Sequence, residues 1–261
     1  MGRSKKRSCH FDRVASKYAH VRNTDPDVVE AIIHHLPTRS RPVDLVDIGC
    51  GTGRYTDIIA RRFKGDLRLL CCDYSAAMIA ECRTRMSRGF PSKDIHYCRV
   101  SASDLSFADA CIDAIVTFNA VHHFDLDRFV IEASRVLRRG GLLSIYTRTP
   151  EQNARTVWGE HFPGFAERET RLYPSERLEE AIGSVSELRS KGIREFTYVR
   201  KEPPDSLLNR ARHFHYSTFA LYSKNEFKRA VAKFARRLSK LSVRGLVEHT
   251  AANTLVLVRK T

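Results

Sequence analysis

The chain has 261 residues, of which 42% are hydrophobic and 29% are charged, and its formal net charge is +15. This composition is ordinary for a globular protein, so it excludes intrinsic disorder as the default, and the length suits one α/β domain with elaborations. No apolar run is long enough to span a bilayer, and no apolar stretch follows the basic residues 1–11 to form a secretory signal, so we expect a cytoplasmic protein without a transmembrane segment.

The excess positive charge lies in two segments. Residues 1–22 contain seven Lys or Arg against one acid, residues 194–244 contain thirteen against four, and the rest of the chain balances. A charged helix is typically a solvated face. Basic residues interleaved with aromatic ones also form the pattern that binds RNA or another polyanion, so both interpretations stay open.

The N-terminal part of the chain is predicted to be helical. Residues 11–22 and 25–36 have the pattern of short helices, and the second begins with Asp25 as N-cap and Pro26 at the first helical position. Residues 39–42 link this part to the first strand.

Strands and helices then alternate. Short, almost continuously apolar segments predict strands at 44–49, 67–73, 95–100, 114–119 and 142–147, and helices are predicted at 55–63, 75–88 and 126–137. Strands of this kind are covered by helices on both faces, so the rhythm predicts a doubly wound parallel sheet.

The alternation ends after Pro150. A helix at 175–182, a strand at 194–200, a basic helical region around 225–238 and a last strand at 253–259 are predicted there. We expect residues 151–192 and 203–246 to be helical excursions from the same sheet.

A glycine-rich loop follows the first strand. Gly49, Gly51 and Gly53 alternate with other residues, where a side chain would collide with a ligand lying on the backbone, and the next helix offers free N–H groups. The spacing is not the G-x-G-x-x-G of dinucleotide sites. Because Asp73 ends the second strand and can accept hydrogen bonds from ribose hydroxyls, a ribose without a pyrophosphate fits better. The alternative is a tight strand–helix junction.

These motifs resemble those of a known family. The stretches LVDIGCGTG (45–53), CCDYSAAMI (71–79), VSASDLSF (100–107), AIVTFNAVHHF (114–124) and VLRRGGLLSI (136–145) are similar to class I S-adenosylmethionine-dependent methyltransferases, in particular the broad small-molecule and quinone-biosynthesis-like (type 11) subfamily. The resemblance implies a Rossmann-like sheet of seven strands, mostly parallel with the last strand antiparallel. It divides the chain into an N-terminal basic helical cap (1–42), a cofactor-binding core (43–150) and lid excursions with the last strands (151–261).

The resemblance also implies site residues for the cofactor S-adenosyl-L-methionine. Asp47 and the glycine loop would hold the methionine part, Asp73 the ribose, and Ser101 stands where relatives often carry an aspartate for the adenine amino group. Asn119 would line the sulfonium, and Tyr18 would either close over the methionine end or pack in the core. The implied cofactor-binding residues are Tyr18, Asp47, Gly49, Cys50, Gly51, Gly53, Asp73, Tyr74, Met78, Ser101, Ala102 and Asn119.

Two groups are candidates for the methyl acceptor side. His122 and His123 follow the fourth strand, where a neutral imidazole can act as a general base, although a structural role fits the pair as well. They lack a third metal ligand at suitable spacing, and the seven cysteines form no C-x-x-C pair, so we expect no metal and reduced thiols. The aromatic segment after the fifth strand is either a lid over the acceptor or a hydrophobic mini-core, with Tyr146, Arg148, Trp158, His161 and Phe162 as lid candidates.

Three functions follow from these features. The first is methyl transfer to a small-molecule acceptor by in-line displacement. The second is methylation of RNA (tRNA or rRNA) held by the basic segments 1–22 and 194–244. The third is a non-catalytic protein that binds S-adenosylmethionine. The acceptor, the methylated atom and the oligomeric state do not follow from the sequence.

Overall fold

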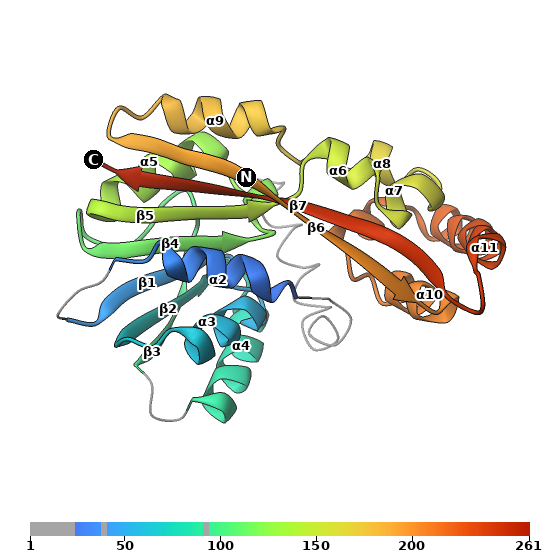
Figure 1. The fold of residues 1–261 in the computed structure, drawn as a ribbon, viewed down its shortest axis with the longest axis horizontal. Coiled ribbons are helices and arrows are strands. Elements are labelled where there is room, and N and C mark those ends of the chain that lie inside the picture. Colours follow the sequence, from blue (N-terminus) through green and yellow to red (C-terminus); the bar gives the residue numbers. More distant parts are fainter. Residues whose placement is uncertain (1–23, 38–40, 91–93) are drawn as a thin grey trace.

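A computed structural model describes residues 24–37, 41–90 and 94–261, and it contains one seven-stranded sheet (Figure 1). The strand order is β3-β2-β1-β4-β5-β7-β6, and only β7 runs against the others. The predicted doubly wound, mostly parallel sheet with an antiparallel last strand is therefore confirmed. The strands are β1 (Val43–Ile48), β2 (Leu67–Asp73), β3 (Ile95–Arg99), β4 (Ile112–Phe118), β5 (Leu137–Thr147), β6 (Leu188–Glu202) and β7 (Val247–Lys260).

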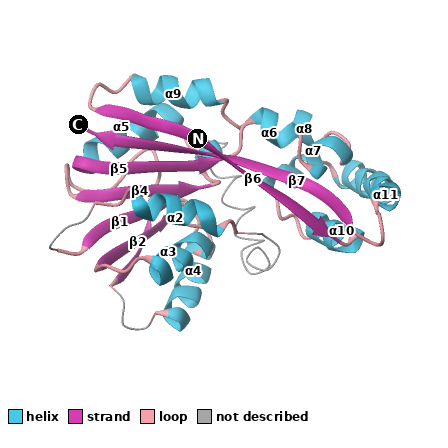
Figure 2. Ribbon diagram, in the orientation of Figure 1, coloured by secondary structure: helices cyan, strands magenta, loops and turns pink. Residues whose placement is uncertain are grey.

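Helices cover both faces of the sheet, as the apolar strands predict (Figure 2). On one face α2 (Pro26–His34), α3 (Arg54–Arg62) and α4 (Ala76–Gly89) share a hydrophobic cluster with the strands, and on the other face α5 (Leu126–Val136) and α9 (Ser175–Gly183) share a second cluster. Helix α9 lies in the segment that we expected to be a lid excursion. It packs on the sheet instead, because Leu178, Ala181 and Ile182 form an apolar stripe.

Strands β6 and β7 extend beyond the sheet as a two-stranded ribbon (Figure 1). Strand β7 pairs with β5 only through Thr254–Arg259, whereas its residues 247–253 pair with β6 alone. Around this ribbon lie α7 (Val157–His161), α8 (Phe165–Arg168), α10 (Pro204–Arg212), η2 (Ser217–Leu221) and α11 (Lys224–Leu241), which we call the helical extension. The short helix α6 (Pro150–Ala154) leads into it. Both excursions from the sheet thus contribute to one helical extension.

The helical extension has a hydrophobic cluster of its own, which is rich in aromatic rings. Trp158 and Phe162 are buried there, with ring centroids 5.1 and 5.2 Å from that of Phe234 on α11. Aromatic pairs at these separations stabilise a core beyond their buried area. The aromatic segment after the fifth strand therefore builds the mini-core that was the alternative to a lid.

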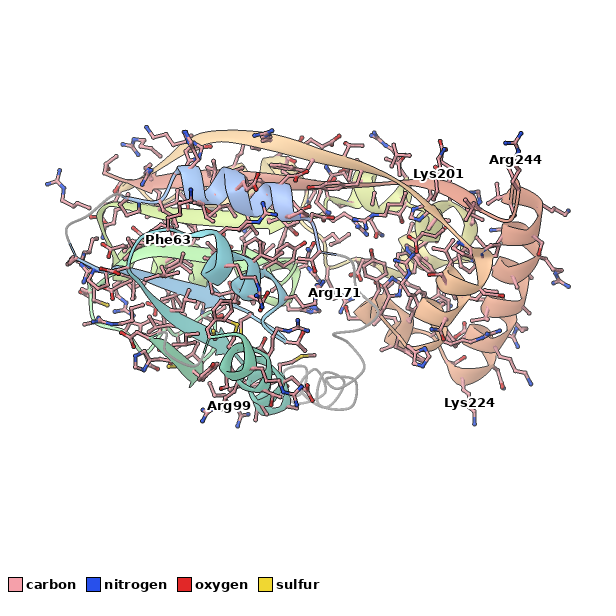
Figure 3. All side chains as sticks on the ribbon, turned by 60° about the horizontal axis from the view of Figure 1, so that its bottom comes forward. Phe63, Arg99, Arg171, Lys201, Lys224 and Arg244 are labelled. Carbon is pink, nitrogen blue, oxygen red and sulfur yellow. The ribbon has the colours of Figure 1, made fainter. Side chains whose placement is uncertain are left out.

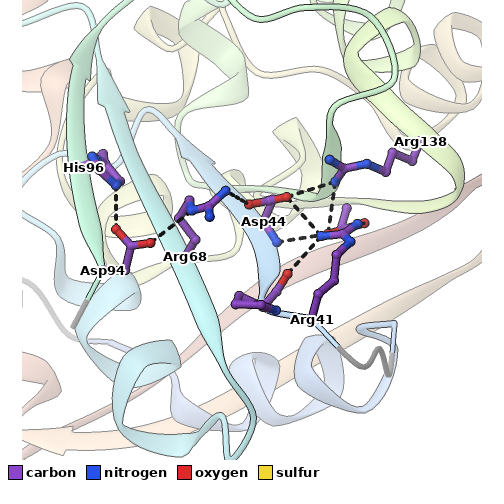
Figure 4. Close-up of polar contacts among 8 residues, drawn as sticks. Arg41, Asp44, Arg68, Asp94, His96 and Arg138 are labelled. Atoms are coloured by element: carbon purple, nitrogen blue, oxygen red, sulfur yellow. Dashed lines mark hydrogen bonds and ion pairs between the residues drawn. The ribbon is translucent and has the colours of Figure 1, made fainter.

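An ion-pair network joins the amino ends of the parallel strands (Figure 4). Asp44 accepts hydrogen bonds from Arg41, Arg68 and Arg138, and the fully buried Asp113 accepts from Arg41 at 2.8 Å. Ligands of open α/β sheets bind outside the opposite, carboxyl ends of the strands. This network therefore serves stability and leaves the other edge free for a site.

Some predictions fall on residues that the structure does not describe. They concern Tyr18, the helix predicted at 11–22 and the basic segment 1–22. In the described ranges, no helix is both long and apolar enough to cross a membrane, and no group of three or more His, Cys, Asp or Glu could hold a metal ion. Helix α2 begins after Asp25 with Pro26 in its first turn, as predicted.

Candidate functional site

A cavity of about 340 Å³ lies at the carboxyl ends of β1, β2 and β4. We call it the larger cavity. The glycine loop, the residues after β2, the loop after β3 and the 3₁₀ turn η1 (Val121–His123) all contribute to its wall. Of the predicted site residues, those that line it are Asp47, Gly49, Cys50, Gly51, Asp73, Tyr74, Met78, Ser101, Ala102, Asn119, His122 and His123.

The glycine loop brings its backbone close to this cavity. Gly51 has φ +55°, and a Cβ built on it would meet no atom within 4 Å, so it would project into open space. A Cβ on Gly49, at φ +74°, would lie 2.5 Å from the Cβ of Ala120. Gly53 does not line the cavity: it precedes α3 and packs against Cys82. The loop therefore leaves room for a ligand lying directly on the main chain.

Asp47, the residue before the last of β1, lines the larger cavity. Its Oδ2 accepts a hydrogen bond from the hydroxyl of Thr56 at 2.5 Å, whereas Oδ1 is buried without a hydrogen-bond partner among the described residues. Burial raises the pKa of this carboxyl to about 7, against a smaller lowering by the Thr56 bond. The hydroxyl of Thr52, another wall residue, is likewise buried without a described partner. A polar ligand that completes the hydrogen bonds of such groups removes the free-energy cost of leaving them buried and unpaired.

Asp73 holds the loop as well as lining the cavity. Its Oδ2 accepts from the Gly51 N–H and its Oδ1 from the Ser75 N–H, both at 2.9 Å. Burial raises the pKa of Asp73 more than these bonds lower it. Ser75 caps α4 by accepting from the Met78 N–H at 3.2 Å, so Asp73 is not the cap. Each carboxylate oxygen has a second lone pair for a ligand.

The loop after β3 and the end of β4 form the remaining wall. The Ser101 hydroxyl accepts from the Ser103 N–H at 3.2 Å and so helps to shape the turn. Asn119 has φ +53°, a left-handed conformation that asparagine tolerates better than most residues. The rings of His122 and His123 are 4.1 Å apart, centroid to centroid, within η1. Two imidazoles are thereby presented at one side of the cavity.

The residues predicted for the lid are not gathered in one place. Tyr146 is fully buried, and its hydroxyl donates to Asp25 at 2.9 Å. Phe162 lies in the aromatic cluster, and the backbone oxygen of His161 accepts from Arg237 on α11. Only Arg148 and Trp158 reach a cavity, and it is a second, smaller one.

The smaller cavity has a volume of about 60 Å³ and adjoins the larger one. Arg54, Tyr55 and Asn119 line both. Tyr55 stacks on Phe118 with centroids 4.2 Å apart, which fixes this common wall. Arg54 and Tyr55 were not predicted as site residues, although they directly follow the glycine loop. Ser217 of η2, which lines the larger cavity, was not predicted either, because it is distant in sequence from every motif.

Comparisons with known proteins identify the part of the chain that forms this site. Residues 46–145 match the family described as "Methyltransferase domain". A "Probable S-adenosylmethionine-dependent methyltransferase" of Mycobacterium tuberculosis is 30% identical over 119 residues, which cover 45% of this chain and 40% of that protein. A "Probable tRNA methyltransferase 9B" of Bos taurus is 36% identical over 118 residues, covering 42% of this chain and 22% of the relative.

The chain thus spans less than half the length of these curated relatives. Among solved structures, the geranyl diphosphate C-methyltransferase of Streptomyces coelicolor is similar with a TM-score of 0.57 and 18% identity, covering 90% of this chain and 77% of that one. At this identity the likeness shows the fold alone. The matched residues 46–145 run from within β1 to within β5 and include nearly all of the wall of the larger cavity.

Proposed function

The chain carries a class I S-adenosylmethionine-dependent methyltransferase domain whose cofactor is S-adenosyl-L-methionine, and from this premise we propose that the protein methylates a small-molecule acceptor. The observation that carries the proposal is the pair of cavities with a common wall. The larger cavity is lined by the family's motifs, and the smaller one is lined in part by the helical extension. The larger cavity takes the cofactor and the smaller one takes part of the acceptor.

The larger cavity suits this cofactor chemically. The unpartnered Oδ1 of Asp47 is an acceptor for the ammonium group, and the bare backbone at Gly51 admits the methionine part. The Asp73 carboxylate faces the place for the ribose hydroxyls, while Ser101 and Ala102 lie where the adenine is expected. When bound, the cofactor supplies a methyl group that its sulfonium already activates.

The protein then has to hold the acceptor in line and exclude water. Orientation of two bound groups supplies much of the rate of such a transfer. Tyr55 and Asn119 belong to both cavities and so define where donor and acceptor meet. His122 or His123, on the wall of the larger cavity, accepts the proton that a hydroxyl or amine acceptor loses.

Enclosure favours a small acceptor over a polymer. Ser217 of the helical extension lines the larger cavity, and its hydroxyl accepts from Arg171 at 3.0 Å. Figure 3 shows Arg171 between the sheet and the helical extension. Trp158 and Arg210 bring the same extension to the smaller cavity. The acceptor is therefore bounded by protein on the side away from the sheet.

RNA remains the second candidate acceptor because of helix α11. This helix exposes Lys224, Lys228, Arg229, Lys233, Arg236, Arg237 and Lys240. Its one acid, Glu226, pairs with Arg168 at 2.8 Å. Figure 3 shows Lys224 and Arg244 on the outer surface of the helical extension. The bovine relative named as a tRNA methyltransferase favours the same candidate.

The deciding experiment incubates the purified protein with methyl-labelled S-adenosylmethionine and a cell extract divided into RNA, protein, lipid and small-metabolite fractions. We expect the label in small metabolites. A double variant Lys228→Glu/Lys233→Glu on α11 should label them as well as the wild type, whereas an RNA acceptor would lose label in this variant and in raised salt. Cofactor binding without label in any fraction would favour the non-catalytic alternative.

A further inference from the structure

We propose that the smaller cavity recognises a carboxylate group of the methyl acceptor and that Arg148 is the residue that binds it. This inference rests on the proposed function, because it gives the acceptor its chemical class. The cavity is small and is lined by Asn119, where we place the methyl transfer. Its wall contains Arg54, Arg148, Arg200 and Arg210 against a single acid, Asp25.

The acids near this cavity are already used by other cations. Asp25 accepts from Arg200 at 2.6 Å. Glu202, just outside the wall, accepts from Arg210 at 2.5 Å and pairs with His249 at 3.1 Å. Two of the four arginines are thereby neutralised within the protein.

Arg148 differs from these arginines because all its partners are neutral. In the described part of the chain it donates to the Tyr216 hydroxyl at 3.0 Å and to the Ala252 carbonyl at 3.4 Å. Its guanidinium lies over the Tyr216 ring, 5.3 Å from the centroid. A bound anion stabilises a partly buried cation that has no counter-charge. The planar guanidinium can donate two parallel hydrogen bonds to a carboxylate.

The dimensions and charges of the cavity favour a carboxylate over a phosphate. The Arg148 guanidinium has no charged partner among the residues that the structure describes and is balanced by one negative charge, while the carboxylates of Asp25 in the wall and of Glu202 just outside it repel a second negative charge. The volume of about 60 Å³ suits one small group, while the rest of the acceptor extends past Asn119 toward the larger cavity. Asn253 and His249 add buried atoms without described partners, Oδ1 and Nδ1, for a polar neighbour of the carboxylate.

Trp158 offers a direct readout, since it is the only tryptophan of the chain and lines the smaller cavity. The protein is saturated with S-adenosylhomocysteine and titrated with sodium acetate, a monocarboxylate, at constant ionic strength while the fluorescence is recorded. We expect a saturable change, at least about tenfold weaker binding of the neutral acetamide, and a similar loss in Arg148→Gln. Arg155→Gln, which changes an exposed arginine nearby, should bind acetate like the wild type.

Each other result has a defined meaning. Binding of S-adenosylhomocysteine without a saturable acetate response would overturn the carboxylate site and leave the proposed function intact. Equal responses to inorganic phosphate and acetate would refute the choice of a carboxylate. Failure to bind S-adenosylhomocysteine would sink the proposed function itself. If Arg148→Gln does not fold, Arg148→Lys keeps the charge without the planar fork and should bind acetate more weakly than the wild type does.

Discussion

Asp47 is the residue whose protonation should control cofactor binding. Its carboxyl is buried, and burial raises its pKa to about 7 in the protein without cofactor. An ammonium group of the ligand pairs with the ionised carboxylate and not with the neutral acid. Binding of the cofactor or of S-adenosylhomocysteine must therefore displace a proton at acidic pH.

The size of the effect follows from this pKa. For one group that must lose a proton, affinity falls about tenfold for each pH unit below the pKa and levels off above it. With a pKa of about 7, S-adenosylhomocysteine should bind about tenfold more weakly at pH 6 than at pH 7.5. Folding responds in the opposite sense: the raised pKa makes the folded state hold the proton more tightly, so the contribution of Asp47 to stability falls as pH rises from about 4 to about 7.

Titration calorimetry of Asp47→Asn against the wild type separates this group from the others in the cavity. The variant keeps an oxygen for the Thr56 hydroxyl but loses the charge, so binding at pH 7.5 should weaken about 10- to 100-fold, the equivalent of a charge-assisted hydrogen bond of about 1.5–3 kcal/mol. Between pH 6 and pH 7.5 its affinity should hardly change. Asp57→Asn, in the neighbouring helix where the carboxylate pairs with Arg61, is the matched control and should titrate like the wild type.

Two results would refute this role of Asp47. A wild-type affinity that is constant from pH 6 to pH 7.5 would mean that Asp47 is not the partner of the ammonium group. A pH dependence that persists in Asp47→Asn would assign the titration to another residue.

Three further changes test other parts of the structure. Asp73→Ala should lower S-adenosylhomocysteine affinity at least about tenfold by calorimetry, because the ribose and the Gly51 N–H lose an acceptor together; unchanged affinity in a folded variant would contradict the site. His123→Ala should lower turnover more than S-adenosylhomocysteine affinity, and equal turnover would remove its role as base. Burial raises the pKa of Asp113, but the hydrogen bond from Arg41 and the neighbouring charges lower it by more, so the net pKa is below its usual value. The ionised Asp113 therefore stabilises the folded state above about pH 4, and this contribution is lost as pH falls below that. Asp113→Asn should therefore cost about 3 kcal/mol in urea unfolding at pH 7, and the cost should shrink as pH falls below about 4; a cost that stays constant with pH would show that the charge is not the cause.

The core of the fold was predictable because its strands are buried on both sides. All residues of β1 and of β4 are buried, so each strand is mostly apolar in the sequence, and the few polar residues within them are buried too. Strands β6 and β7 were predicted too short, at 194–200 and 253–259, whereas they span 188–202 and 247–260. Most residues of β6 are exposed because it is the edge strand of the sheet, so no apolar run marks where it begins.

The two cavities of the site also differ in how well the sequence predicts them. Residues of the larger cavity, next to the glycine loop and the strand ends, could be predicted from short motifs, because residues close in sequence surround the ligand there. The smaller cavity could not be predicted, because Asp25, Arg148, Arg200, Arg210 and Asn253 come from parts of the chain that only the tertiary fold brings together. Trp158 was expected near the acceptor as a lid residue, and it lines the smaller cavity while belonging to the aromatic cluster.

Asp25 explains how two separately packed parts can share one site. Its Oδ2 accepts from Tyr146 on β5 at 2.9 Å, and its Oδ1 accepts from Arg200 on β6 at 2.6 Å. The Tyr146 hydroxyl in turn accepts from Asn253 on β7 at 3.0 Å. One buried carboxylate thereby ties the start of α2 to the strands that leave the sheet and carry the helical extension. The rate of in-line transfer falls when donor and acceptor are displaced by small distances. A fixed junction at Asp25 therefore holds the smaller cavity, where we place the acceptor, in a constant position relative to the larger cavity, where we place the cofactor.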